Sequence, residues 1–514
     1  MNTTPAFTQA HISYAAVVPM LVIFGAALIG VLIEAFVPRG ARYFAQIGLT
    51  LITLIASFLT LVLSACYHRG VTAASAVVID GPALMLQGTV LVLSFVAVLA
   101  MAERFDTGAV DAFTQSGASA PGSPMETNAA KLDATTTEVF PLTLFSIGGM
   151  MLFVAAGDLL VMFIALEVLS LPLYILTGLA RRRRLLSQEA SLKYFLLGAF
   201  SLAFFLFGSA LVYGATRTIQ FGPLALAISA MSGKDAILIP GVLLIAVGLL
   251  FKVGAVPFHS WTPDVYQGAP TPVTGFMASC TKVTAFGAML RVFYVAVDGL
   301  RWNWQPVIAV IAVLTMVVGA VFSVTQTDIK RLLAYSSITH AGFLLIGIVA
   351  LNKPGLSGVM FYLVTYGFTT IAAFALVALV RSAGFEATHL SQWAGLGRIS
   401  PVLAATFSFL MLAFAGIPLT SGFVAKFALF SSVVGHGSAW LAVIGVVTSV
   451  VTAFVYVRVI VMMYFFEPTG VTEVLMPSPL TGISVTIGAL ATLVLGVAPA
   501  PLLDLTQHSA LFMR

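Results

Sequence analysis

The sequence predicts an all-α polytopic membrane protein with about 14 transmembrane helices, two inverted five-helix repeats and discontinuous helices 7 and 12. Of its 514 residues, 60% are hydrophobic and only 8% are charged, and the mean hydropathy is +1.06. Soluble globular chains carry about 25% charged residues. Apolar stretches of roughly 20 residues, the length that crosses a bilayer as a helix, recur along the chain. Two successive blocks of these stretches have nearly equal length.

Short polar connections separate the apolar stretches, so each stretch predicts one helix. The expected spans are 14–37, 44–66, 82–102, 139–156, 158–179, 188–213, 236–260, 272–298, 305–326, 331–351, 356–381, 401–434, 438–466 and 480–504. The first three form an N-terminal segment over 1–102. The last lies in a C-terminal segment over 480–514.

The distribution of Lys and Arg predicts the orientation. Twelve basic residues follow odd-numbered spans, and six lie on the other side, termini included. By the positive-inside rule, the first set is cytoplasmic and both termini lie outside the cytoplasm. The first set is Arg39, Arg42, Arg104, Lys131, Arg181, Arg182, Arg183, Arg184, Lys330, Arg331, Arg381 and Arg398.

Two connections are longer than the rest. Residues 103–138 are rich in Ser, Thr, Ala and acidic side chains, a composition too polar for a packed core. We expect a mobile cytoplasmic loop there. Residues 214–235 should lie at the outer surface.

The block 139–298 holds spans four to eight in 160 residues, and the block 305–466 holds spans nine to thirteen in 162 residues. Equal blocks indicate a duplication. Because five is an odd number, the second block must enter the membrane from the opposite side, as in the inverted repeats of transporters.

The fourth span of each block contains helix-breaking residues. The stretch AGIPLTSG over 415–422 interrupts a span of about 34 residues, and KVGAVPFH over 252–259 lies in the seventh span. Proline lacks the backbone donor that a helix needs, and glycine permits irregular backbone. Unwound backbone at membrane depth is tolerated around a protein-lined or water-filled cavity. We therefore expect both helices to be discontinuous at a cavity.

Ionisable side chains within these spans are the candidate functional residues. A charge at the bilayer centre costs about 2.5–3.5 kcal/mol on insertion scales, so such residues usually line a pathway. Lys252 and Glu167 are central in their spans and form the best acid and base pair. Their structural alternative is a static ion pair that locks the fifth span to the seventh.

The other candidates differ in strength. Lys282 lies among Ser and Thr side chains that can hold water, and Lys426 follows Pro418 in the broken twelfth span. Snorkelling to the surface rivals a proton role for Lys193. His340 is either a proton carrier or a satisfied interhelical hydrogen-bonder.

Other kinds of chemistry find no support in the sequence. Two cysteines exclude a disulfide framework and an iron–sulfur cluster, and no spacing of His, Asp or Glu predicts a metal site. Basic residues gather in short loops, which argues against nucleic acid. The arginines at 181–184 predict an orientation anchor and a contact with anionic lipids.

Three stretches carry a family resemblance. The run FKVGAVPFHSWTPDVYQGAPTPVTGF (251–276), AYSSITHAGF (334–343) and GIPLTSGFVAKF (416–427) resemble the antiporter-like subunits of proton-pumping NADH:quinone oxidoreductase, respiratory complex I. The large subunits of multi-subunit cation/proton antiporters share this fold. The stretch DVYQGAPTPV is unlike the L-type and M-type subunits.

The resemblance implies that Glu167 and Lys252 pair in a first half-channel, that Lys282 and His340 lie on a central axis, and that Lys426 titrates in a second half-channel. Lys193 matches a family lysine. It further implies a non-redox subunit of a translocating enzyme in a bacterial inner membrane. This chain would hold no cofactor, and NADH, FMN, iron–sulfur clusters and quinone would reside in partner subunits. The expected partners are M-type and small K-, J- and A-type membrane subunits, and lipids.

The predicted mechanism is electrostatic. A pair of charges at about 4 Å contributes about 4 kcal/mol at an effective dielectric constant of 20. Opening the Glu167–Lys252 pair would therefore favour release of the lysine proton toward Lys282, His340 and Lys426. A cation/proton antiporter on the same fold and a non-pumping scaffold subunit remain the alternatives.

Overall fold

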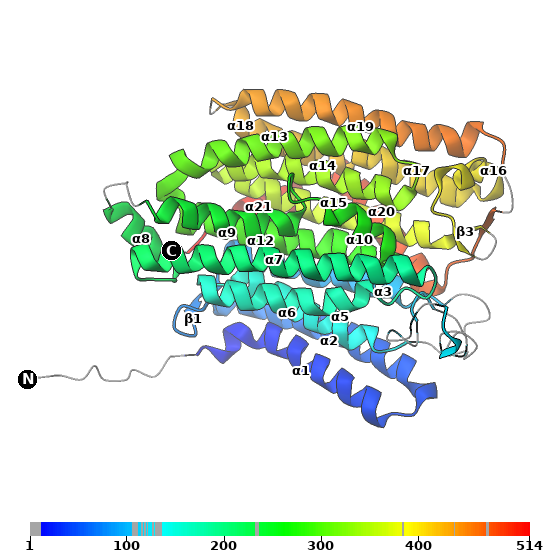
Figure 1. The fold of residues 1–514 in the computed structure, drawn as a ribbon, viewed down its shortest axis with the longest axis horizontal. Coiled ribbons are helices and arrows are strands. Elements are labelled where there is room, and N and C mark those ends of the chain that lie inside the picture. Colours follow the sequence, from blue (N-terminus) through cyan, green and yellow to red (C-terminus); the bar gives the residue numbers. More distant parts are fainter. Residues whose placement is uncertain are drawn as a thin grey trace, which may run out of the picture.

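The chain is a bundle of helices that run along one common direction (Figure 1). The computed structural model describes residues 12–104, 111–114, 117, 120, 122–125, 128, 136–231, 236–382, 385–435, 437–468 and 472–513. Within these residues, eleven helices are long and apolar enough to cross a membrane, and five shorter apolar helices accompany them. The all-α polytopic class is confirmed.

The N-terminal segment contributes α1 (Tyr14–Phe36), α2 (Arg39–Tyr67) and α3 (Gly81–Met101). A short hairpin of β1 (Gly70–Thr72) and β2 (Val77–Ile79) joins α2 to α3. In the most apolar 18-residue stretch of each helix, 78% of α3 is buried, against 39% of α1. Thus α3 is a core helix, whereas α1 keeps an apolar outer face that suits lipid.

The first block consists of α5 (Val139–Ala155), α6 (Leu159–Thr177), α7 (Arg184–Thr216), α8 (Phe221–Ala230), α9 (Leu238–Val253), α10 (Trp261–Gly268) and the continuous run Thr271–Ala296. That run comprises α11 (Thr271–Phe276), η1 (Met277–Thr281), α12 (Lys282–Arg291) and η2 (Val292–Ala296). The most apolar 18-residue stretch of this run is completely buried. The π-helical turns η1 and η2 flank α12, and such turns are frequent at functional sites.

The second block consists of α13 (Arg301–Thr325), α14 (Ile329–Ala350), α15 (Lys353–Leu379), α16 (Leu396–Ile399), α17 (Pro401–Ala415), α18 (Ser421–Val434) and α19 (Ala439–Phe465). Its long elements follow the order of the first block, with α13 in the place of α5 and α17–α18 in the place of α9–α10. The chain ends with α20 (Pro479–Val497) and α21 (Ala500–Ser509).

Both predicted helix breaks are present. Helix α9 ends at Val253 and α10 begins at Trp261, while α17 ends at Ala415 and α18 begins at Ser421. Gly254 and Gly416 cap the first halves in the left-handed region, with φ of +75° and +83°. A residue with a Cβ atom is disfavoured there, so glycine lets each helix end inside the bundle.

The number of fourteen crossings stays a prediction, because three expected spans are represented by short helices. Helix α5 has 17 residues, α9 has 16, and α17 and α18 have 15 and 14. The last expected span, 480–504, is wrong at its end. Helix α20 stops at Val497, and α21 starts separately after Pro499 because proline cannot continue a helical hydrogen-bond ladder.

The two ends of the bundle differ in character. We call the end that carries Arg181–Arg184, Lys330, Arg381 and Arg398 the basic end; it lies on the right in Figure 1. The terminal end carries the start of α1 and Met513. At the basic end β3 (Val380–Ser382) pairs with β4 (Phe385–Glu386) and with β5 (Thr472–Val474). This sheet and α8 were not predicted from the sequence.

The segment 103–138 is described only in part, and the mobility expected of it stays a prediction. Its described residues include several that are packed. Phe113 is buried and pairs with Ala180, and the amide of Thr136 donates to the Asp111 carboxylate at 2.6 Å. The remaining residues of this expected loop lie outside the described part of the chain.

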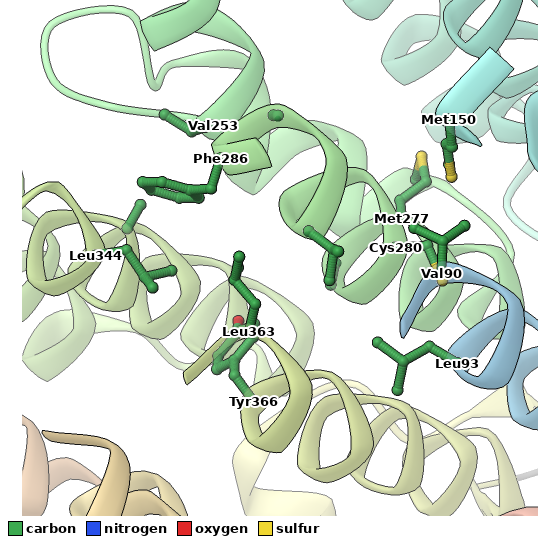
Figure 2. Close-up of a cluster of buried hydrophobic side chains, with 14 of the residues drawn as sticks. Val90, Leu93, Met150, Val253, Met277, Cys280, Phe286, Leu344, Leu363 and Tyr366 are labelled. Carbon is green, nitrogen blue, oxygen red and sulfur yellow. The ribbon is translucent and has the colours of Figure 1, made fainter. Parts of the chain in front are cut away.

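A central apolar core joins the N-terminal helices to both blocks (Figure 2). It brings Val90 and Leu93 of α3 against Met277 and Cys280 of η1. From the second block, Leu344 and Leu363 pack toward Phe286. These side chains hold the buried run Thr271–Ala296 between the two blocks.

Candidate functional site: a chain of buried lysines

Lys252 lies in the last turn of α9, two residues before Gly254, and only 5% of it is exposed. Its ammonium donates to Ser170 Oγ at 2.8 Å and to Tyr194 Oη at 3.2 Å. Both acceptors are neutral hydroxyls from neighbouring helices, α6 and α7. The break therefore places a buried lysine among groups that can relay a proton.

Glu167 lies on α6 one turn before Ser170 and is half-buried. A cavity of about 10 Å³, lined by Glu167, Ser170, Tyr174 and Lys252 among others, lies beside it. This is about the smallest cavity volume that can hold one water molecule. No ion pair within 4 Å joins Glu167 to Lys252. The structure thus brings the predicted acid and base to one cavity but in an open arrangement.

Lys282 follows directly after the π-turn η1 and is buried against the second block. Its ammonium donates to both the hydroxyl and the carbonyl of Ser337 on α14. The nitrogen also lies 5.1 Å from the ring centre of Tyr366. Lys282 therefore bridges the two blocks through neutral acceptors.

His340 lies one turn after Ser337 and is bonded on both ring nitrogens. Nδ1 lies 2.5 Å from the Tyr362 hydroxyl, and Nε2 lies 3.3 Å from the Tyr456 hydroxyl, which also bonds Ser336. These contacts satisfy a neutral interhelical histidine. They also make a line of hydroxyls across α14, α15 and α19.

Lys426 lies in α18 and reaches back to the end of α17. It donates to the carbonyls of Phe414 and Ala415 at 2.9 and 2.8 Å, and to Ser449 Oγ at 2.7 Å. The two carbonyls are free of helical partners because α17 ends there. The break therefore supplies the acceptors that hold this buried ammonium.

The two broken-helix lysines lie on opposite sides of their helix breaks. Lys252 precedes its break, in the first half of the helix, whereas Lys426 follows its break, in the second half. The reason is local. Lys252 turns sideways to hydroxyls on other helices, while Lys426 turns back to the carbonyls of its own broken helix.

Lys193 differs from the other lysines because 43% of its side chain is exposed. It pairs with Glu189 at 2.6 Å and with Asp264 at 2.8 Å, and Arg331 also pairs with Asp264 at 2.7 Å. These pairs join α7, α10 and α14 at the basic end. The contacts match the surface alternative raised for Lys193 in the sequence analysis.

Aromatic rings connect the first lysine to the central one. Tyr194 stacks on Trp261 with ring centres 4.7 Å apart, and Trp261 meets Tyr266 edge to face at 6.5 Å. The Tyr266 hydroxyl contacts the Ser337 hydroxyl that holds Lys282. Nothing in the sequence predicted the contacts of Tyr194, Tyr266 and Ser337, because only the fold brings these helices together.

A buried ion pair at the terminal end was not predicted from the sequence either. Arg291 and Asp80 are 1% and 0% exposed, and their two bonds measure 2.7 and 3.0 Å. Arg291 stands within an apolar span, a signal that could have identified it. Among the described residues, no cluster of three or more His, Cys, Asp or Glu side chains could hold a metal ion.

Comparisons with known proteins agree with this architecture. The family model described as NADH:quinone oxidoreductase/Mrp antiporter, transmembrane, matches residues 156–452, a range that includes all six candidate residues. The chain is 56% identical to NADH-quinone oxidoreductase subunit N of Salinispora arenicola, over 98% of both chains. It is 52% identical to the subunit N of Mycobacterium tuberculosis, over 98% of this chain and 99% of the relative.

Solved structures share the fold. A chain of respiratory complex I from Thermus thermophilus with bound aureothin superposes with a TM-score of 0.77 at 30% identity, covering 95% of this chain and 98% of that one. A chain of the Mrp complex from Dietzia sp. gives 0.77 at 22% identity, with 97% of each chain covered, and shows the fold alone. The chain therefore belongs to the antiporter-like membrane subunits of NADH:quinone oxidoreductase, in the subunit N family.

Proposed function

We propose that this chain translocates protons across the membrane within complex I, along Glu167, Lys252, Lys282, His340 and Lys426. Electron transfer from NADH through FMN and iron–sulfur clusters to quinone would take place in partner subunits. The chain would sit in a bacterial inner membrane beside M-type and small K-, J- and A-type subunits. The basic end would face the cytoplasm.

One observation carries this proposal. Lys252, Lys282 and Lys426 are all buried, and none has a carboxylate within 4 Å in the described part of the chain. Each ammonium is held by hydroxyl or carbonyl oxygens instead. A purely structural buried charge is usually paired, because removing the partner of a buried ion pair costs about 3–5 kcal/mol. Lysines held only by neutral acceptors can release a proton without breaking an ion pair.

The open arrangement at Glu167 suggests how pumping is timed. When Glu167 approaches Lys252, its charge favours the ammonium form; when it withdraws, burial favours the neutral amine. The released proton would pass through Ser170 and Tyr194 toward the hydroxyls around Ser337. A movement of α6 imposed by a neighbouring subunit would thus switch the first lysine. Lys193, at the surface, would deliver protons to Asp264 or stabilise the fold.

The test is Lys252→Met in the assembled complex. Methionine has a similar length and no charge, so packing is kept while proton exchange is removed. We expect the ratio of protons pumped to NADH oxidised to fall, with the complex still assembled. Lys353→Met is the matched control, because Lys353 is exposed at the start of α15.

The alternatives predict other results. A scaffold subunit would show less assembled complex and an unchanged ratio in the complex that remains. A cation/proton antiporter would show sodium-dependent proton exchange in vesicles without NADH. An unchanged ratio in fully assembled Lys252→Met complex would refute the proposal.

A further inference from the structure

A cavity of about 230 Å³ opens at the basic end, between the turn before α7, the start of α11, the start of α14 and the sheet β3–β4–β5. It is separate from the three buried lysines. The cavity has room for several water molecules. A small polar group with part of its hydration shell would fit.

Five cationic side chains line the cavity: Arg181, Arg182, Arg183, Lys330 and Arg381. Three carboxylates line it as well: Asp111, Glu386 and Glu473. The lining is therefore more positive than negative by two charges. Two of the cations, Lys330 and Arg381, are 2% and 8% exposed, so water screens them little.

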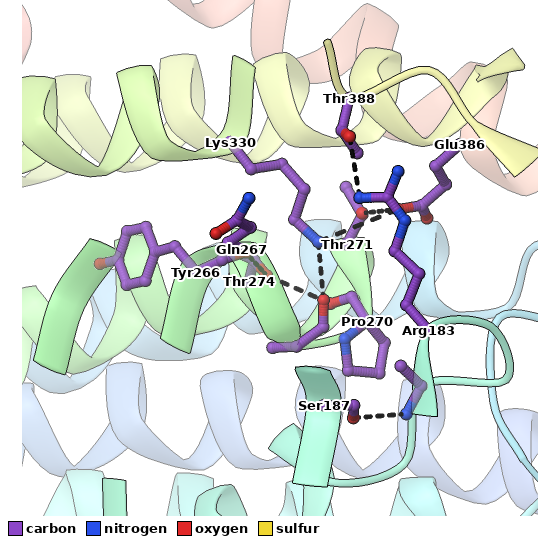
Figure 3. A network of polar contacts seen from close by, with 12 residues as sticks. Arg183, Ser187, Tyr266, Gln267, Pro270, Thr271, Thr274, Lys330, Glu386 and Thr388 are labelled. Carbon is purple, nitrogen blue, oxygen red and sulfur yellow. Dashed lines mark hydrogen bonds and ion pairs between the residues drawn. The ribbon is translucent and has the colours of Figure 1, made fainter. Parts of the chain in front are cut away.

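Two of the acids, Glu386 and Asp111, have partners within the protein. Glu386 accepts from Thr271 at 2.8 Å and lies 3.9 Å from Lys330 (Figure 3). Across the sheet, Arg381 has Glu386 and Glu473 as its neighbours on the two adjacent strands. Asp111 accepts from two backbone amides and lies 3.9 Å from Arg181. The carboxylates of Glu386 and Asp111 therefore already accept bonds within the protein.

Two arginines face neutral groups instead. Arg183 donates to the Thr388 hydroxyl at 2.8 Å, and Arg182 lies over the Phe385 ring at 4.9 Å. Within the described residues, neither guanidinium has a carboxylate within 4 Å. Arginine forks bind the paired oxygens of phosphate groups, and basic pockets between membrane helices bind lipid head groups.

We infer that this cavity is a binding site for a phosphoryl group, held by Arg182, Arg183 and Lys330. The group is either free inorganic phosphate or the head group of an anionic phospholipid. Because the site touches α7, α14 and the sheet at once, its occupant would fasten the two five-helix blocks together at the basic end.

The test uses the assembled complex in two kinds of nanodisc, one of phosphatidylcholine alone and one of phosphatidylcholine mixed with cardiolipin. Inorganic phosphate is added stepwise to the first kind. Hydrogen–deuterium exchange reports protection of backbone amides in residues 178–188. Three variants are compared: Arg183→Gln, Arg182→Gln as a second variant in case the first fails to assemble, and Arg398→Gln as the control. Arg398 is an exposed arginine at the same end that does not line the cavity and pairs with Glu467.

We expect phosphate to protect these amides. In Arg183→Gln or Arg182→Gln the same protection should need about tenfold more phosphate, because one charge-assisted hydrogen bond is lost. In Arg398→Gln the phosphate concentration needed should be unchanged. Protection by phosphate in phosphatidylcholine supports the free anion. Protection only with cardiolipin, lost in the same variants, supports the lipid. Absence of protection in both kinds of nanodisc, or an equal effect of Arg398→Gln, would overturn the inference.

Discussion

Gly416 lets Lys426 reach the carbonyls at the end of α17. Its φ of +83° lies in the left-handed region, where a residue with a Cβ atom is strained by about 1–2 kcal/mol. A Cβ atom added at Gly416 would also lie 3.0 Å from Lys426 Cδ and 3.2 Å from Lys426 Nζ. One glycine thus serves both the helix break and the lysine.

Gly416→Ala should therefore disturb proton transfer and stability together. We expect a lower ratio of protons pumped to NADH oxidised and earlier heat inactivation of the complex, because the added methyl group displaces Lys426 from its acceptors. Gly435→Ala is the control, since Gly435 has a negative φ of −85° and open space around its Cα. Equal behaviour of the two variants would contradict this account.

Asp111 makes the cavity at the basic end sensitive to pH. Burial raises the pKa of Asp111 to about 6, although two backbone amides, Arg181 and Arg104 act in the opposite direction. As the pH falls through about 6, the carboxyl takes up a proton and the cavity gains one positive charge. Sulfate keeps its two charges over this range, so it is a suitable probe.

We expect protection of residues 178–188 by sulfate to need severalfold less anion at pH 5.5 than at pH 7.5. In Asp111→Asn the side chain cannot titrate, so the affinity should be high at both pH values. Hydrogen–deuterium exchange, corrected for the intrinsic pH dependence of exchange, measures the sulfate affinity of the unmodified protein and of the variant. A pH dependence that persists in Asp111→Asn would assign it to another group.

At the scale of elements, a buried clamp joins α12, α3 and the C-terminus. Arg291 holds Asp80 and the carbonyl of Val154, the amide of Met513 donates to Asp80 at 3.2 Å, and the Phe512 ring lies 5.2 Å from the arginine. Asp80 also caps α3 through the amide of Ala83. The clamp therefore fixes the terminal end of the buried run that carries Lys282.

Asp80→Asn keeps the cap but leaves the Arg291 charge unpaired, and Arg291→Gln leaves the Asp80 charge unpaired. Each should reduce the amount of assembled complex, because an unpaired buried charge costs about 3–5 kcal/mol. The double variant should recover part of the loss, since two amides can bond each other. Native gels measure the amount of assembled complex. If the loss in the double variant equalled the sum of the losses in the two single variants, the clamp would be contradicted.

The elements also show how much of the structure could be predicted from the sequence. Most long helices from 14 to 465 begin and end within a few residues of the expected spans, because apolar runs and Pro or Gly breaks are local signals. Helix α8 was not expected, and α9 ends at Val253, before the expected end of its span. The contacts Lys252–Tyr194, Lys282–Ser337 and Arg291–Asp80 were not predicted, because they join residues more than 50 positions apart. The family resemblance could name Lys193, but the fold was needed to see its surface pairs.

At the scale of the whole molecule, the buried run Thr271–Ala296 lies between the two blocks, and its Lys282 bonds Ser337 of α14. Aromatic packing leads from Tyr194, which bonds Lys252, through Trp261 and Tyr266 of α10 to Ser337. Ser337 and His340 are one turn apart on α14. If protons cross from Lys252 to His340 in this region, the two blocks form one path; if they do not, each block is an independent half-channel.

A double-mutant cycle separates these possibilities. Ser337→Ala removes one acceptor of Lys282, and Lys252→Met removes the first lysine. On a single path the second break adds little once the first has stopped the flow, so the double variant should pump as poorly as the worse single variant. Independent half-channels predict that the two losses add. Ser323→Ala is the control for removing a buried hydroxyl, because Ser323 bonds only the carbonyl of Ala320 in its own helix. The ratio of protons pumped to NADH oxidised in proteoliposomes decides between the two.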